Sequence, residues 1–159
     1  MIIENAGIAD IDQLIELRVE YLKEDYGGLS EEDIKKIRRD LPEYFKRNLN
    51  KNIFCYLMKN KEQAVACAFL LIIEKPMSPA FINGRTGMVL NVYTRPPYRR
   101  RGYAKMLMQK LQSDAVEKKV CVVELKSTED GYHLYQSLGF VDDRSKYHVM
   151  RWDFGKNKT

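Results

Sequence analysis

The stretch of this sequence best suited to bind an anion is a run of three arginines followed by a glycine. It consists of Arg99, Arg100, Arg101 and Gly102. An apolar segment ends just before it at two prolines, and a helical pattern begins just after it at Tyr103 and Ala104. Free N–H groups in the first turn of a helix point outward, and the helix dipole makes that end positive. The glycine lets a ligand approach the backbone, and Ala104 keeps the first turn open. This arrangement predicts a phosphate or pyrophosphate site.

The elements before this turn follow from hydrophobic periodicity. Ile2-Ile3 is a candidate strand. A helix is expected from Asp10 to the glycines at 27–28, and Asp10 with Gln13 forms a capping-box pattern at its start. Ser30 predicts the start of a second helix, which Pro42 should break or kink, with a short further segment to about Asn50. Residues 53–58 and 64–73 predict an antiparallel hairpin, and residues 74–85 a loop.

The second half of the chain alternates strands and helices around the basic turn. Residues 87–93 predict a strand, residues 102–118 an amphipathic helix, and residues 120–125 a strand buried on both faces. A short helix at 130–138 should end at Gly139, with closing strands at 140–141 and 148–153. We expect residues 155–159 to fray. The order predicts a mixed α/β (α+β) fold with about four helices on one central sheet.

Composition narrows the class of protein. The chain has 159 residues and a net charge of +5, which favours one domain spanning 1–159 and suits a polyanionic ligand without requiring nucleic acid. No signal peptide or membrane-spanning run is evident, so a cytoplasmic protein without membrane contact is expected. The three cysteines, Cys55, Cys67 and Cys121, lie in apolar segments and are expected to be reduced and buried. They and the two histidines are too dispersed to predict a metal site. Of those histidines, His133 should lie at the surface or cofactor rim, and His148 should be structural in the last strand.

Two motifs together resemble the GCN5-related N-acetyltransferases, which bind acetyl-coenzyme A. The segment VYTRPPYRRRGYA is similar to that family's pyrophosphate motif, and LYQSLGF is similar to its Leu-Tyr-x-x-x-Gly-Phe segment. The order of elements also agrees along essentially the whole chain. The resemblance implies a single domain with a mostly antiparallel twisted sheet, in which two central parallel strands splay apart to admit the cofactor.

The resemblance implies a role for each matching residue. The strand end that pairs with the pantetheine arm corresponds to Val92, Tyr93 and Thr94. The pyrophosphate loop corresponds to Arg99, Arg100, Arg101, Gly102, Tyr103 and Ala104. Ser127 and Tyr132 are implied as further cofactor contacts, and Tyr135 matches the tyrosine that hydrogen-bonds the coenzyme sulfur and protonates the leaving thiolate. The implied activity is acetyl transfer from acetyl-coenzyme A to a primary amine through a ternary complex, without a metal.

The base that would deprotonate the amine is not identifiable. Many family members carry a glutamate on the strand before the pyrophosphate turn, but residues 87–94 contain no carboxylate. Asn91 could position a water there, although it cannot accept a proton at neutral pH. The other candidates are Glu20, Glu24, Glu74 and Glu124, and a water relay also remains open.

The sequence does not identify the acceptor amine either. Acids and tyrosines cluster at the end of the first helix (Glu20, Tyr21, Glu24, Asp25 and Tyr26), which would suit a cationic small molecule or a peptide amine. Two other functions remain as alternatives: a coenzyme A-binding sensor or partner without catalysis, and, less favoured, a nucleic-acid-binding module that uses the basic turn. A homodimer is common in folds of this kind.

Overall fold

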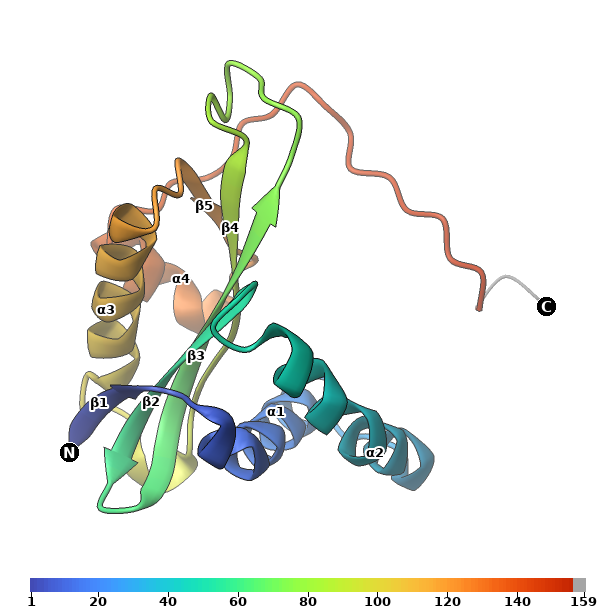
Figure 1. Cartoon of the computed structure of the whole chain (residues 1–159), viewed down its shortest axis with the longest axis vertical. Helices are drawn as coiled ribbons and strands as arrows, with labels where there is room; N and C mark the ends of the chain where they lie inside the picture. Colours follow the sequence, from blue (N-terminus) through green and yellow to red (C-terminus); the bar gives the residue numbers. More distant parts are fainter. Residues whose placement is uncertain (156–159) are drawn as a thin grey trace.

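The strands of the central sheet follow one another in chain order. A computed structural model describes residues 1–155 and places five strands side by side in the order β1-β2-β3-β4-β5 (Figure 1). Their bounds are β1 Ile2–Asn5, β2 Ile53–Asn60, β3 Gln63–Glu74, β4 Arg85–Thr94 and β5 Val122–Glu124. Neighbouring strands are antiparallel except β4 and β5, which are parallel. This is the predicted mixed α/β fold with a mostly antiparallel sheet.

Four α-helices cover the two faces of this sheet. They are α1 Ile11–Asp25, α2 Glu31–Asn48, α3 Tyr103–Glu117 and α4 Glu129–Ser137, with short 3-10 turns at η1 Ile8–Asp10 and η2 Pro96–Tyr98. In Figure 1, α1 and α2 lie on one side of the sheet and α3 and α4 on the other. Alternate residues of β2 face opposite layers: Cys55 and Leu57 pack with α1 and α2, while Tyr56 and Met58 pack with α3. Both faces of β2 and β3 are therefore covered, which explains their continuous apolar runs. None of the helices within residues 1–155 is both long and apolar enough to cross a bilayer.

The two N-terminal helices differ from the sequence prediction in two details. Ser30 caps α2 as predicted, accepting a hydrogen bond from the Asp33 N–H at 3.1 Å. The expected capping box of Asp10 and Gln13 is wrong, because Gln13 bonds the hairpin turn instead, accepting from the Ala64 N–H at 2.6 Å. The break expected at Pro42 is also wrong: α2 continues through it. Residues on both sides of the proline, including Ile34 and Phe45, are buried in one cluster, and this packing holds the two halves of the helix together.

The expectations for the last part of the chain are largely wrong. β5 has only three residues, which are half-buried or exposed rather than buried on both faces. The described residues after 140 form no strand, so neither closing strand is present, and His148 lies exposed in an extended segment. That segment leaves the body of the molecule in Figure 1. Its large apolar side chains, including Trp152 and Phe154, are 73% to 97% exposed. β5 therefore stays an edge strand, beside a hollow of about 350 Å³ that is partly lined by Val122, Phe140 and Val141.

The cysteines only partly match the expectation. All three are free thiols, and Cys55 and Cys67 are buried as predicted, but Cys121 is exposed. Cys121 precedes the short edge strand β5, where its thiol donates to the Arg85 carbonyl at 3.3 Å. Its exposure follows from the missing strand pairing on that side of the sheet. The predicted frayed end falls, apart from Gly155, outside the described residues.

Candidate active site

A bulge in β4 forms the centre of the candidate site. Cys67 of β3 faces Tyr93 and Phe69 faces Leu90, so that Asn91 and Val92 together oppose Ala68 alone. Asn91 takes a positive φ of 54° and is only 3% exposed. Its side-chain amide donates to the Cys67 thiol at 3.3 Å, and the same thiol donates to the Asn91 carbonyl at 3.3 Å. Asn91, predicted to position a water, thus uses its side chain to hold the bulge.

β4 continues well beyond the end of its parallel partner β5. Their pairing runs from Thr86 with Val122 to Met88 with Glu124 and then stops, while β4 continues to Thr94. The predicted cofactor strand, residues 92–94, lies in this unpaired part. Its edge toward β5 is therefore available to hydrogen-bond an extended ligand. The expectation of two central parallel strands that splay apart is not met: instead β5 is a short edge strand, and all three of its residues pair with β4.

The basic turn after β4 has the form of an anion cradle. Arg100 and Gly102 have positive φ values of 61° and 77°, and α3 begins at Tyr103. The first helical bond runs from the Met106 N–H to the Gly102 carbonyl at 3.1 Å. Within residues 1–155, the N–H groups from Arg100 to Lys105 find no hydrogen-bond acceptor. A Cβ at Gly102 would have no atom within 4 Å, so the space above these N–H groups is open. Both features fit a pyrophosphate.

The three arginines of the turn have different surroundings. Arg99 donates to the Thr94 carbonyl at 2.8 Å and pairs with Glu24 of α1 at 2.6 Å. That hydrogen bond with Glu24 raises the pKa of the Arg99 guanidinium. Arg101 donates to the Pro97 carbonyl at 3.2 Å and lies over the Tyr98 ring. Arg100 is exposed, and its side chain contacts no acidic group among the described residues. Arg100 is therefore the arginine most available to an incoming anion.

Tyr135 enters the site from α4. Its ring is half-buried and packs edge-on against Phe140, with ring centroids 6.0 Å apart. Burial raises the pKa of Tyr135 to about 12, with a smaller contribution from Tyr21 of α1. Gly131 makes room for the ring, because a Cβ there would lie 2.9 Å from Tyr135 Cε2. This requirement for glycine one turn before the tyrosine was not anticipated from the sequence.

The other two residues expected to contact the cofactor from this region form local hydrogen bonds. Ser127 is exposed and donates to the Thr128 carbonyl at 2.6 Å. The hydroxyl of Tyr132 donates to Asp142 at 2.9 Å, which raises the pKa of Tyr132. His133 is exposed beside the Tyr132 ring, at the surface as expected. Tyr135 is therefore held by packing against Phe140, whereas Ser127 and Tyr132 make only local hydrogen bonds.

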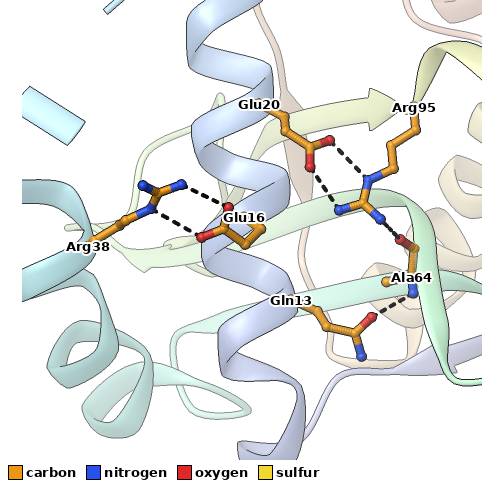
Figure 2. A network of polar contacts seen from close by, with 6 residues as sticks. All are labelled: Gln13, Glu16, Glu20, Arg38, Ala64 and Arg95. Carbon is orange, nitrogen blue, oxygen red and sulfur yellow. Dashed lines mark hydrogen bonds and ion pairs between the residues drawn. The ribbon is translucent and has the colours of Figure 1, made fainter. Parts of the chain in front are cut away.

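The acidic residues considered as bases are mostly engaged by arginines. Figure 2 shows Glu20 of α1 bound by both ends of the Arg95 guanidinium, at 3.0 and 2.8 Å. Arg95 also donates to the Ala64 carbonyl at 3.0 Å, and its hydrogen bond with Glu20 raises its pKa. Glu24 pairs with Arg99, and Glu74 pairs with Arg85 at 3.3 Å. Glu124 is exposed at the end of β5.

These pairs fix α1 relative to the sheet. On one side of α1, Glu16 binds Arg38 of α2 at 3.1 and 3.0 Å; on the other side, Gln13 and Glu20 reach the ends of β3 and β4 (Figure 2). The sequence indicated an acidic surface here for a cationic substrate. In the folded chain two of its acids, Glu20 and Glu24, instead hold the helix against the β4 end and the basic turn.

One residue of the site went unnoticed in the sequence. Arg18 of α1 is half-buried and donates to the Asn91 side-chain oxygen at 3.0 Å. Its guanidinium carbon lies 5.7 Å from the centre of the Tyr21 ring, and Tyr21 in turn packs edge-on against Tyr93 at 6.4 Å. Only the fold brings residue 18 to residue 91, and no local pattern around Arg18 distinguishes it from a surface arginine.

Comparison with known proteins agrees with this fold. The model of the acetyltransferase (GNAT) family matches residues 12–140. The crystal structure of a predicted acetyltransferase from Clostridium acetobutylicum with acetyl-CoA superposes with a TM-score of 0.81 and 27% identity, covering 94% of this chain and 95% of that one. A GCN5-related N-acetyltransferase from Ralstonia eutropha JMP134 gives a TM-score of 0.75 at 21% identity, covering 94% and 97%. No curated protein matches the sequence.

Proposed function

Because the chain belongs to the acetyltransferase (GNAT) family, we propose that it transfers the acetyl group of acetyl-coenzyme A directly to a primary amine within a ternary complex. The observation that carries this proposal is the row of unbonded N–H groups from Arg100 to Lys105 below the open space at Gly102. This row would bind the pyrophosphate, with Arg100 as the nearby free cation. The unpaired edge of β4 would then hold the pantetheine arm.

The residues at the β4 bulge would polarise the thioester. Tyr93 pairs with Cys67 of β3 directly after the bulge. Because the bulge at Asn91 and Val92 interrupts the regular pairing with β3, we expect the Val92 N–H to face the gap toward β5. A backbone donor in that position would stabilise the charge that develops on the thioester oxygen. The bulge held by Asn91 fixes where this donor points.

Tyr135 would hydrogen-bond the departing sulfur. Its pKa is about 12, whereas a free thiol has a pKa of about 8.5, so complete proton transfer from the phenol to the thiolate is uphill by roughly 3.5 pKa units, or ~5 kcal/mol. A strong hydrogen bond from the neutral phenol to the developing thiolate has no such cost. We therefore assign Tyr135 as a donor that positions and stabilises the sulfur rather than as a complete proton source.

Direct transfer is favoured over a route through an acetylated cysteine. Cys67 is the thiol at the bulge, and it is fully buried. Burial raises its pKa to about 12, which keeps it protonated and poorly nucleophilic at neutral pH. The acceptor amine would therefore attack the thioester itself. It must do so as the neutral amine, which is a minor species for an alkyl amine of pKa ~10.

The proposal is tested first by acetyl-coenzyme A binding. We expect the thermal midpoint to rise on titration, and a ligand at about 100 times its Kd should add ~2.7 kcal/mol to the free energy of unfolding. Arg100→Glu should reduce the shift strongly, since it places a negative charge beside the cradle. Arg39→Glu is the matched control: it reverses a charge on the exposed surface of α2, where Arg39 pairs with Asp40.

Turnover is then measured as thiol release with a panel of amines. Double-reciprocal plots of initial rate whose lines intersect to the left of the vertical axis would support a ternary complex, and parallel lines would contradict it. A parent protein that gives no thermal shift with acetyl-coenzyme A would refute the proposal at its first step. Equal shifts in the Arg100→Glu and Arg39→Glu variants would show that the basic turn is not the binding site.

A further inference from the structure

Arg18 is a half-buried cation at the centre of the site without an acidic partner. Within residues 1–155, no carboxylate lies within 4.0 Å of its guanidinium, in contrast to Arg38, Arg95 and Arg99 around it. Its contacts are the Asn91 side-chain oxygen at 3.0 Å and the face of the Tyr21 ring. A guanidinium carries five N–H donors, and one of those of Arg18 is used by the part of the chain that the structure describes. None of the unused nitrogens is buried, so they are accessible to an incoming anion.

The acids of the same helix do not neutralise Arg18. Glu20 and Glu24 are taken by Arg95 and Arg99, and Glu16 is taken by Arg38 on another side of α1. The remaining acid near this end of the helix is Asp25, two turns further along and exposed. Because Glu20 and Glu24 beside the end of β4 are held by arginines, Arg18 is left as a positive charge at the bulge with no carboxylate partner among residues 1–155. The bulge does not present the acidic surface that a polyamine would require.

We propose, building on the acetyl transfer proposed above, that Arg18 binds an anionic group of the acceptor, so that the substrate is a primary amine carrying a carboxylate or a phosphate a few bonds from its nitrogen. The guanidinium fork matches both anions in a bidentate manner. The spacing follows from position: Arg18 contacts Asn91, the residue directly before Val92, where the thioester oxygen is expected. An anion held by Arg18 and an amine at the thioester must therefore belong to a short segment of one molecule.

A purely structural role for Arg18 makes different predictions. If Arg18 only holds Asn91 and the bulge, its replacement should disturb acetyl-coenzyme A binding and all acceptors alike. If it binds the acceptor's anion, its replacement should raise the KM for anionic acceptors alone and leave the KM for acetyl-coenzyme A unchanged. Arg18→Met keeps the apolar stem and removes the charge. Arg18→Lys keeps a charge without the fork, and Arg39→Met is the control for loss of a surface arginine.

The experiment compares paired acceptors that differ only in the anion. Amino acids are compared with their primary amides, and amino-sugar phosphates with the parent amino sugars, by thiol release and, with coenzyme A present, by thermal shift. An amide's amine is less basic and more often neutral, so a preference for the free acid runs against intrinsic reactivity. We expect kcat/KM for the best anionic acceptor to exceed that of its neutral partner at least tenfold, with most of this difference lost in Arg18→Met and partly retained in Arg18→Lys.

Each outcome separates the two proposals. Equal or better turnover of neutral amines or polyamines overturns the anion site, as does an equal loss for all acceptors in Arg18→Met. If no amine is turned over but anionic amines still raise the thermal midpoint of the wild type and not of Arg18→Met, the anion site stands and the acetyl-transfer proposal fails. If anionic amines neither react nor shift the midpoint, the anion site is refuted. Comparing the phosphate-bearing acceptors with the carboxylate-bearing acceptors identifies which anion the Arg18 guanidinium binds.

Discussion

Replacing Gly131 by alanine should separate catalysis from stability at this site. The added methyl group would lie 2.9 Å from Tyr135 Cε2 and 3.4 Å from Thr128 Oγ1. Ordinary carbon–carbon contact begins near 3.5 Å, so the tyrosine ring must move by about 0.6 Å. The backbone of α4 gains from the change, because alanine is better than glycine in a helix by up to ~1 kcal/mol. These effects oppose each other, and we expect the free energy of unfolding to stay within about 1 kcal/mol of the wild type.

The displaced ring should nevertheless slow the reaction. A tyrosine hydrogen bond to a charged sulfur is worth ~1.5–3 kcal/mol, so Tyr135→Phe should lower kcat about 10- to 150-fold. Gly131→Ala misplaces the same hydroxyl and should lower kcat about tenfold, with little change in acetyl-coenzyme A binding. The assay is thiol release at saturating substrates, with thermal and denaturant unfolding measured on the same preparations.

A double variant tests whether the two residues act through one hydrogen bond. If the methyl group acts only by moving the hydroxyl, adding Gly131→Ala to Tyr135→Phe should change kcat no further. Unchanged kcat in the single Gly131→Ala variant would refute the assignment of Tyr135 as sulfur donor in this geometry. Losses that multiply in the double variant would show that Gly131 affects the site by another route.

Two further predictions concern ion pairing and pH. Glu20→Gln should destabilise the fold by about 1 kcal/mol, because the Glu20–Arg95 pair is doubly hydrogen-bonded and its side chains are 34% and 21% exposed. In Glu16→Gln the lost pair with Arg38 is more exposed, at 47% and 48%, so the cost should be less than about half as large. Denaturant unfolding of both variants measures the difference. Tyr135 keeps its proton up to about pH 12 in the folded state and to about pH 10 when unfolded. The protonated side chain therefore adds to the free energy of unfolding below pH 10, and this contribution is lost as the pH rises from 10 to 12. Between pH 9 and pH 11 the wild type should therefore lose ~1.3 kcal/mol more stability than Tyr135→Phe, and equal losses would contradict the raised pKa.

The sequence predicted best where local chemistry determines structure. The strand before the basic turn and the helix after it follow from a few neighbouring residues, as do the cap of Ser30 and the end of α4 before Gly139. The apolar runs of β2 and β3 predicted a hairpin for the same reason. Such features need no knowledge of distant contacts.

What the sequence could not predict depends on residues far apart in the chain. Gln13 has the spacing of a capping residue but bonds Ala64, 51 positions away, and Arg18 meets Asn91, 73 positions away. The acids of α1 illustrate the same limit. Their clustering indicated a surface for a cationic ligand, but the arginines that neutralise Glu20 and Glu24 lie 75 positions further along the chain. Charge balance at the site therefore became evident only from the fold.

That balance bears on how the acceptor loses its proton. Glu20 and Glu24 are the carboxylates of α1 that face the end of β4, and either would have to release its arginine before it could accept a proton. Tyr135 cannot serve as the base, because a phenol of pKa about 12 is almost wholly protonated at neutral pH. At pH 7.5 an α-amine of pKa ~8 is neutral in about a quarter of molecules, against roughly one in 800 for a lysine-like amine of pKa ~10.4. The ratio of the two neutral fractions corresponds to a free-energy difference of ~3 kcal/mol for presenting the neutral amine. For the proposed transfer, an acceptor amine that arrives neutral, or that loses its proton to water on the way in, would not require Glu20 or Glu24 to release its arginine.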